Sequence, residues 1–363
     1  MKFLHIFPVE KFTEGYISFV NDNFDSSEHL FLLVKAHEYY PKYADRFSNV
    51  IYLSGDFRNN YLVFTKQVMK RNVEIYLHSM FLSDKYKLIL FLLLRIKKLS
   101  LTWIVWGGDL YYSIKLKKQD KKTIRERREL LLYNAIIIKC KTIATLVKGD
   151  YELLNKHFAH FSNYKKAVYI NPVKTDFLKS PILQSEKDEL IRIQIGNSAS
   201  STNNHEEIFC DLKKFKDENI EIYCPLSYGD ENYANQIALL GKNIFGNKFI
   251  PMTEFINPKE YSNFILKMDI LIMNNNRQQG LGNISAYATL GKKIFVRSDV
   301  CMWQYLQDEC SLKIFDTKNI QDLNFSGFKE MKPHDSANNS KKANYYFYSQ
   351  DYLFEVWSSI FEQ

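Results

Sequence analysis

The chain has 363 residues, of which 46% are hydrophobic and 25% charged, which excludes a disordered chain and matches the length of about two globular domains. Its formal net charge is +8, but it carries no nucleic-acid-binding motif, and we exclude nucleic acid as a partner. No apolar stretch approaches the roughly 18 residues of a membrane-spanning helix, and the five cysteines lack the spacing of a metal site.

The first half of the chain predicts short strands that alternate with helices, a pattern typical of a parallel α/β sheet. The expected strands are Lys2–Phe7, Phe31–Val34, Asn49–Tyr52, Val73–Leu77, Leu101–Val105 and Thr142–Leu146. Two polar residues stand at strand ends: His78 after the fourth strand, and Asp109 after the fifth strand and a pair of glycines. Such an Asp can accept a proton from a hydroxyl in a cleft between domains. The alternatives are a helix cap for Asp109 and a structural role for His78.

A basic segment and an apolar segment also lie near each other in the first half. Lys115–Arg128 contains eight Lys or Arg residues, and Tyr86–Lys98 is an apolar run that ends in three cations. This combination suits the surface of an anionic bilayer. The alternative is one buried helix followed by one solvated helix.

The segment Pro172–Glu189 contains two prolines and has no clear periodicity, which is typical of an interdomain connection. We therefore expect an N-terminal domain over residues 1–172 and a C-terminal domain over residues 190–340. The aromatic segment 345–363 is expected to form a helix that packs back on the first domain.

The second half alternates strands and helices regularly, so we expect a second parallel sheet. The expected strands are Ile191–Gly196, Ile220–Pro225, Met268–Asn276, Lys292–Ser298 and Ser311–Phe315, and the expected helices are Asn204–Lys216, Glu231–Gly241, Pro258–Met268 and Asn283–Lys293. Polar loops follow three of these strands, at Gly196–Glu206, Pro225–Asn232 and Arg277–Asn283. Because ligands bind at the carboxyl ends of parallel strands, these loops predict a cradle for a nucleotide diphosphate.

The third loop is the most informative one. It places Arg277 and two glycines, Gly280 and Gly282, where a strand turns into a helix. A helix start offers unpaired N–H groups and the positive end of the helix dipole, and glycines allow an anion to approach the backbone. Arg277 adds a lasting positive charge for a diphosphate. Neither a Walker A sequence nor GxGxxG is present, which argues against a P-loop or a dehydrogenase.

The first loop also allows a purely structural interpretation. Gly196, Asn203 and Asn204 are residue types that commonly terminate strands and cap helices.

Four segments, GNSASSTNNHE, PLSYGDENY, RQQGLGNISAYATLGKKIF and WGGDLYY, resemble at these spacings the bacterial 4-acetamido-4,6-dideoxygalactose (Fuc4NAc) transferase family, glycosyltransferase family 56, of enterobacterial common antigen synthesis. The likeness extends from His78 to about Phe315. It implies the GT-B fold, with two Rossmann-like domains whose parallel sheets face each other across a cleft. It also implies catalysis with neither a metal nor another cofactor.

The same resemblance implies transfer of a deoxy or amino-deoxy hexose, such as Fuc4NAc or fucose, from a dTDP-, GDP- or UDP-linked donor. The acceptor would be a saccharide on undecaprenyl diphosphate, for surface polysaccharide such as common antigen or O-antigen. The enzyme would be peripheral, at the cytoplasmic face of the inner membrane. The helix NISAYATLG departs in polarity from the family, so the donor sugar can differ.

Carried onto this sequence, the donor side would comprise Gly196, Asn197, Ser198, Asn204, His205, Pro225, Tyr228, Arg277, Gln278, Gln279, Gly280, Gly282 and Asn283. Asp109 and His78 would face the acceptor and act in catalysis together with Arg277. Two other functions stay open: a nucleotide-sugar epimerase or hydrolase of the same architecture, and a non-catalytic nucleotide-sugar-binding protein.

Overall fold

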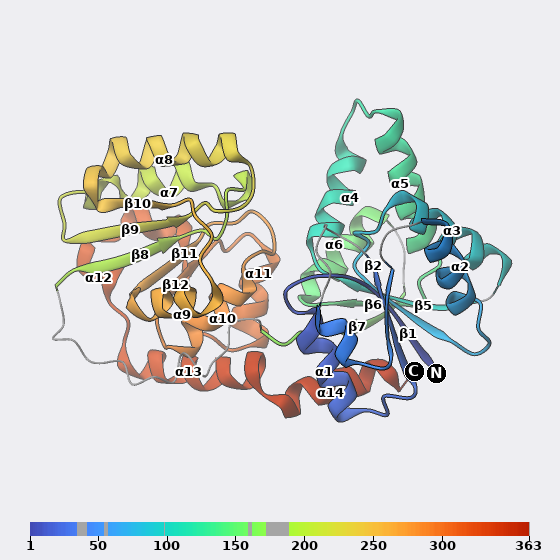
Figure 1. Ribbon diagram of the computed structural model, residues 1–363. Coiled ribbons are helices and arrows are strands. Elements are labelled where there is room, and N and C mark those ends of the chain that lie inside the picture. Colours follow the sequence, from blue (N-terminus) through green and yellow to red (C-terminus); the bar gives the residue numbers. More distant parts are fainter. Residues whose placement is uncertain (35–41, 54–56, 98, 159–161, 172–188, 363) are drawn as a thin grey trace. The chain divides into compact units, whose positions relative to one another are not determined.

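The computed structural model describes residues 1–34, 42–53, 57–97, 99–158, 162–171 and 189–362. It divides into two compact units, one formed by Met1–Pro172 with Asp351–Gln363 and the other by Val173–Gln350. Each unit contains one parallel sheet with helices packed on its faces (Figure 1).

The sheet of the first unit has the strand order β3-β2-β1-β4-β5-β6-β7. Its strands are β1 (Phe3–Pro8), β2 (His29–Val34), β3 (Val50–Leu53), β4 (Glu74–His78), β5 (Ser100–Val105), β6 (Thr142–Thr145) and β7 (Asn163–Lys166). The six predicted strands are present with ends shifted by one or two residues. The strand β7 was not predicted, because this edge strand reads Asn-Tyr-Lys-Lys and has no buried residue that would mark it.

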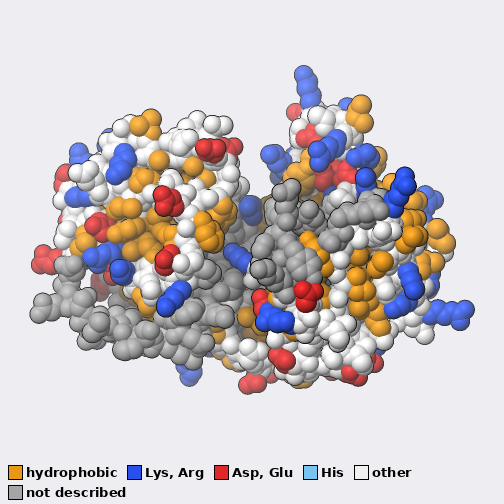
Figure 2. Space-filling view, viewed as in Figure 1, with side chains coloured by type: hydrophobic (Ala, Val, Ile, Leu, Met, Phe, Trp, Pro, Cys, Tyr) orange, Lys and Arg blue, Asp and Glu red, His pale blue; other side chains and the backbone are white. Residues whose placement is uncertain are grey.

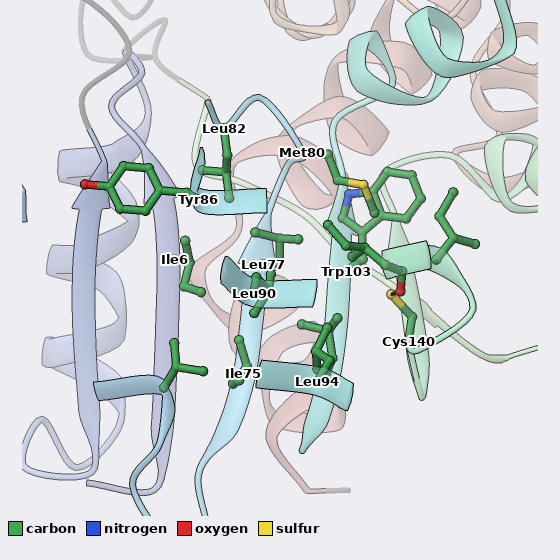
Figure 3. Packing of buried hydrophobic residues seen from close by; sticks show 14 of the residues in the cluster. Ile6, Ile75, Leu77, Met80, Leu82, Tyr86, Leu90, Leu94, Trp103 and Cys140 are labelled. Atoms are coloured by element: carbon green, nitrogen blue, oxygen red, sulfur yellow. Dashed lines mark hydrogen bonds between the residues drawn. The ribbon is translucent and has the colours of Figure 1, made fainter. Parts of the chain in front are cut away.

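Helices cover both faces of this sheet. They are α1 (Thr13–Asn23), α2 (Phe57–Val68), α3 (Asp84–Ile96), α4 (Gly108–Lys118), α5 (Ile124–Ile137), α6 (Lys148–Phe158) and α14 (Gln350–Phe361). On one face, Figure 3 shows Ile6, Leu77 and Trp103 of the strands packed against Leu90 and Leu94 of α3. No helix in the described part of the chain is both long and apolar enough to cross a membrane.

The opposite face is covered by α1 and by the C-terminal helix α14. The Trp357 indole Nε1 donates a hydrogen bond to the Val168 carbonyl at 2.7 Å, and the Tyr76 hydroxyl donates one to the Ile360 carbonyl at 3.2 Å. These contacts anchor the end of the chain to the first unit.

The second unit has the strand order β10-β9-β8-β11-β12-β13. Its strands are β8 (Ile191–Ile195), β9 (Ile220–Pro225), β10 (Phe249–Met252), β11 (Ile270–Met273), β12 (Lys293–Val296) and β13 (Phe315–Asp316). Its helices are α7 (His205–Leu212), α8 (Glu231–Phe245), α9 (Pro258–Lys267), α10 (Leu281–Thr289), α11 (Cys301–Gln304), α12 (Phe325–Lys329) and α13 (Pro333–Tyr348). Since β8 lies between β9 and β11, the loops that leave these three strands start at the same edge of the sheet.

Several boundaries in the second unit differ from the prediction, among them three around β11 and α10. The helix expected over Asn283–Lys293 begins at Leu281 and ends at Thr289, so Gly282 lies inside its first turn. The strand expected over Met268–Asn276 ends at Met273, because the asparagines that follow it bond to the loop after β8 and do not continue the strand. The strand β10 was not predicted either, because it is short and contains Pro251.

Candidate functional site

Three loops meet at the carboxyl edge of the second sheet. We call them the β8 loop (Gly196–Glu206), the β9 loop (Pro225–Asn232) and the β11 loop (Arg277–Asn283). The backbone joins the first two: the Ala199 N–H donates to the Tyr228 carbonyl and the Asp230 N–H donates to the Ala199 carbonyl, both at 2.8 Å. Gly229 permits this approach, since its φ is +121° and a Cβ there would lie 2.4 Å from the Ala199 oxygen. Gly229 was not among the predicted site residues.

Side chains of all three loops form one polar cluster around Gln279. The Gln279 amide nitrogen donates to Asn197 Oδ1 at 3.1 Å and to Ser198 Oγ at 3.2 Å. Asn197 Nδ2 in turn donates to the Tyr228 hydroxyl at 2.8 Å, and Thr202 Oγ1 donates to Gln279 Oε1 at 2.7 Å. The structure thus brings together four of the predicted residues, Asn197, Ser198, Tyr228 and Gln279. Thr202 was missed, because a threonine in a polar run gives no signal of its own.

The β11 loop turns into α10 at Gly280, which is the N-cap of the helix. Its φ of +69° lies in the left-handed region, and a Cβ at this position would come within 2.2 Å of Met273 Cε. Glycine is therefore required for the turn. Among the described residues no side chain caps this helix start, and the positive end of the helix dipole at Gly280 suits an anion.

Arg277 is half-buried beside this turn, and its Nη1 donates to the Gln278 carbonyl at 3.1 Å. Burial raises the pKa of the Tyr228 hydroxyl, and the positive charge of Arg277 is among the effects that oppose this rise. Arg277 therefore lies within electrostatic reach of the polar cluster. The Gln278 side chain is buried at the same turn.

Three predicted residues lie behind the edge of the sheet. Asn204 has a left-handed backbone and donates through Nδ2 to the Asn274 carbonyl at 2.9 Å. His205 is fully buried, with Nδ1 3.0 Å from the Tyr233 hydroxyl, and burial lowers its pKa to about 4. Pro225 is the last residue of β9 and is buried. These positions support the loops from within, and a direct role in ligand binding stays a prediction for all three.

Asp109 is oriented differently from our expectation. It was expected to project from a strand end, but its side chain is fully buried within the first unit. Oδ2 accepts hydrogen bonds from the Met80 N–H and the Trp103 indole at 3.0 Å, and Oδ1 accepts from the Trp106 and Leu110 N–H groups at 3.1 Å. Burial raises the pKa of this carboxyl, and these hydrogen bonds oppose the rise. The helix begins at Gly108 with Gly107 as its N-cap, so Asp109 lies in the first turn of α4 and is not the cap. The geometry favours a structural role, and a catalytic role stays a prediction.

His78 is also fully buried, which differs from the expected orientation toward an acceptor. It is the last residue of β4 and lies on the sheet face that α1 and α14 cover, with Tyr16 and Trp357 as ring neighbours. Its Nε2 is 3.0 Å from His5 Nδ1, and its Nδ1 is 2.5 Å from the Tyr169 hydroxyl.

His78 belongs to a row of three buried histidines. His5 Nε2 is 3.0 Å from His29 Nδ1, so the three rings connect β2, β1 and β4; we call them the histidine row. Burial lowers the pKa of all three rings, to about 4 for His29. Each ring is therefore neutral at pH 7, so one of its nitrogens carries a hydrogen and the other can accept one.

Solved structures share this architecture over the whole chain. A glycosyltransferase from Rickettsia africae ESF-5 superposes with a TM-score of 0.67 at 13% identity, covering 99% of this chain and 97% of that one. A sucrose-phosphate synthase from Thermosynechococcus elongatus gives a TM-score of 0.66 at 9% identity and covers 100% and 99%. The S. aureus MnaA–UDP structure gives 0.58 at 12% identity and covers 99% and 96%.

The fold of this chain, with two parallel α/β sheets, is that of the GT-B glycosyltransferases. A family model described as 4-alpha-L-fucosyltransferase, glycosyl transferase group 56, matches residues 13–362, and the chain belongs to this family. It is therefore a glycosyltransferase, as the resemblance in the sequence implied.

Proposed function

We propose that this glycosyltransferase moves a deoxy or amino-deoxy hexose, such as fucose or Fuc4NAc, from a nucleoside-diphosphate donor to a lipid-linked saccharide at a membrane surface. The observation that carries the donor half is the convergence of the β8, β9 and β11 loops on the start of α10. The proposal of a lipid-linked acceptor is supported by the outer surface of the first unit.

The diphosphate of the donor would lie on the first turn of α10, next to Gly280. Its charge is matched by the helix dipole and by the guanidinium of Arg277. As the glycosyl bond breaks, negative charge grows on the leaving diphosphate, and preorganised donors stabilise that charge best in the transition state.

The nucleobase would lie against Tyr228. This residue is 57% exposed, yet its hydroxyl is held by Asn197, so the ring is a fixed aromatic surface at the edge of the site. Stacking of a base on such a ring contributes about 1–3 kcal/mol and tolerates different bases. The ring therefore supports nucleotide binding without selecting uridine, thymidine or guanosine.

The acceptor lipid would be reached through an outer surface formed by α3 and α5. The two helices pack side by side, joined by ion pairs of Lys87 with Glu129 at 2.8 Å and of Arg128 with Asp84 at 2.6 Å. We call their outward stripes the α3–α5 face; it contains Lys85, Leu88, Leu92, Arg95 and Ile96 of α3, Ile124, Arg128 and Leu131 of α5, and Ile138 just after it.

Large apolar side chains on this face are exposed to solvent, with exposed fractions of 88% for Ile124 and 68% for Leu131. Hydrophobic and basic side chains are interspersed over this part of the first unit in Figure 2. Exposed apolar groups between cations fit an anionic bilayer, in which each basic residue near the surface contributes about 1 kcal/mol.

A turnover assay tests the proposal. Purified enzyme is given a panel of dTDP-, GDP- and UDP-linked deoxy and amino-deoxy hexoses, with and without a polyprenyl-diphosphate-linked saccharide, and release of nucleoside diphosphate is measured. We expect release with one donor only when the lipid-linked saccharide is present. Release without acceptor would support the hydrolase alternative, and isomerisation of the donor sugar without acceptor would support the epimerase alternative. Binding of the donor with neither release nor isomerisation would support the non-catalytic one.

A further inference from the structure

A buried chain of hydrogen bonds in the second unit ends on Asn283, in the first turn of α10. The Tyr287 hydroxyl donates to Gln194 Oε1 at 2.7 Å, and Gln194 Nε2 lies 3.2 Å from the Tyr261 hydroxyl. The Tyr261 hydroxyl donates to Asn283 Oδ1 at 3.0 Å. The chain therefore connects β8 and α9 with the start of the helix at which the donor diphosphate is proposed to bind.

The direction of this chain is determined at one point, the carbonyl of Gly196. Gln194 Nε2 lies 3.0 Å from this oxygen, and because a carbonyl can only accept, the atom facing it must be the amide nitrogen. The second hydrogen of that nitrogen is donated to the Tyr261 oxygen. The Tyr261 O–H is then left to donate onward, so the atom of Asn283 that it meets must be the carbonyl oxygen.

The consequence is that Asn283 turns its amide NH2 away from Tyr261. Within the described residues this NH2 has no acceptor, and the side chain is only half-buried. The backbone beside it is already engaged, since the Asn283 N–H donates to the Gly280 carbonyl at 2.9 Å. An oriented donor with two hydrogens thus stands next to the N-cap glycine of α10.

We propose that Asn283 donates its side-chain amide to an oxygen of the donor diphosphate, and that Tyr261 and Gln194 are positioning residues that keep its NH2, and not its oxygen, facing the anion. This inference rests on the proposed function. A hydrogen bond to an ionised group is stronger than one between neutral groups. Without the Tyr261 hydroxyl, the amide can rotate by half a turn and present its oxygen, which an anion repels.

The chain contains a matched control in Tyr287. Its side chain is fully buried, whereas that of Tyr261 is half-buried, and its hydroxyl belongs to the same chain of hydrogen bonds but binds the Gln194 oxygen, away from Asn283. The Gly196 carbonyl orients Gln194 without help from Tyr287. Tyr287→Phe therefore removes a buried hydrogen bond but leaves the orientation of the Asn283 side-chain amide unchanged.

The test is calorimetric titration of the wild type with UDP, GDP and dTDP, followed by titration of three variants with the nucleotide that binds most tightly. Asn283→Ala is expected to weaken binding by about 10- to 100-fold and Tyr261→Phe by about 3- to 10-fold. Tyr287→Phe is expected to bind the nucleotide within about twofold of the wild type, although its melting temperature falls at least as much as that of Tyr261→Phe, because its side chain is the more deeply buried of the two.

The outcomes separate this inference from the proposed function. If no nucleotide binds the folded wild type, the proposed donor site is wrong and the role of Asn283 falls with it. If the wild type binds but Tyr261→Phe binds equally well, only the positioning role is overturned. Equal losses of affinity in Tyr261→Phe and Tyr287→Phe would also overturn it, because they would show a common effect of packing.

Discussion

Arg277 brings a permanent positive charge to the turn before α10, and its removal is the simplest test at the scale of one residue. Loss of a donor that stabilises transition-state charge typically costs about 100- to 1000-fold in rate, so we expect Arg277→Ala to lower kcat by this factor. Arg192→Ala is the control, since Arg192 lies at the amino end of β8 and pairs with Glu221 at 3.6 Å. Wild-type turnover of a folded Arg277→Ala enzyme would remove Arg277 from the site.

Asp109 offers a second test, because its two possible roles predict opposite results. Both carboxylate oxygens accept hydrogen bonds, and an amide would turn an NH2 group toward donors that need an acceptor. A structural role predicts that Asp109→Asn loses about 1–3 kcal/mol of unfolding free energy, while kcat of the folded fraction stays within about tenfold of the wild type. Chemical denaturation and turnover are measured on the same preparation. A dead enzyme of unchanged stability would instead support the catalytic role.

At the scale of elements, the histidine row predicts sensitivity to acid. The pKa of His29 is about 4 in the folded chain and near 6.5 when unfolded, so the unfolded state binds protons first as the pH falls. The contribution of neutral His29 to the free energy of unfolding is therefore fully present above pH 6.5. It is lost as the pH falls toward 4, by up to about 3 kcal/mol. Thermal unfolding between pH 7 and 4.5 measures the loss.

His29→Phe separates this effect from the titration of carboxylates. The ring of His29 already lies among Phe3, Phe24 and Phe361, so an aromatic replacement fits the site. The variant is expected to lose less of its melting temperature between pH 7 and 4.5 than the wild type. The same pH dependence in both proteins would show that His29 titrates normally.

The α3–α5 face makes a prediction about lipid binding. In sedimentation with vesicles rich in phosphatidylglycerol, a Leu131→Ser, Ile124→Ser double variant should bind about tenfold more weakly than the wild type, because less apolar area enters the bilayer. Leu239→Ser is the control, since Leu239 is 65% exposed but lies on α8 of the other unit. Equal binding of all three proteins, or no binding at all, would leave this face as an ordinary solvated surface.

The elements also show which parts of the fold and of the site could be predicted from the sequence. All strands except β7 and β10 were predictable because short apolar runs alternate with amphipathic helices, and the three loops were predictable because polar, glycine-containing runs follow strands. The roles of Gly229 and Tyr261 were not, because they arise from contacts with Ala199 and Asn283 that only the fold creates. The burial of His78 was equally hidden, since it depends on α14 at the far end of the chain.

At the scale of the whole molecule, the architecture is retained while the residues are not. The solved structures of similar fold cover at least 99% of this chain with identities of 9–13%. The layers of helix and sheet therefore define the fold, whereas the polar edges of the two sheets must define donor and acceptor. Specificity has to be sought in the loops, above all in the β11 loop and the turn that it makes into α10.

The most direct measurement is a crystal structure of the enzyme with the nucleoside diphosphate that binds it most tightly. We expect the diphosphate within hydrogen-bonding distance of the Leu281 backbone N–H and the Asn283 side-chain amide, with the guanidinium of Arg277 beside it and the base against Tyr228. A diphosphate bound elsewhere, with the first turn of α10 in contact with water alone, would contradict the account.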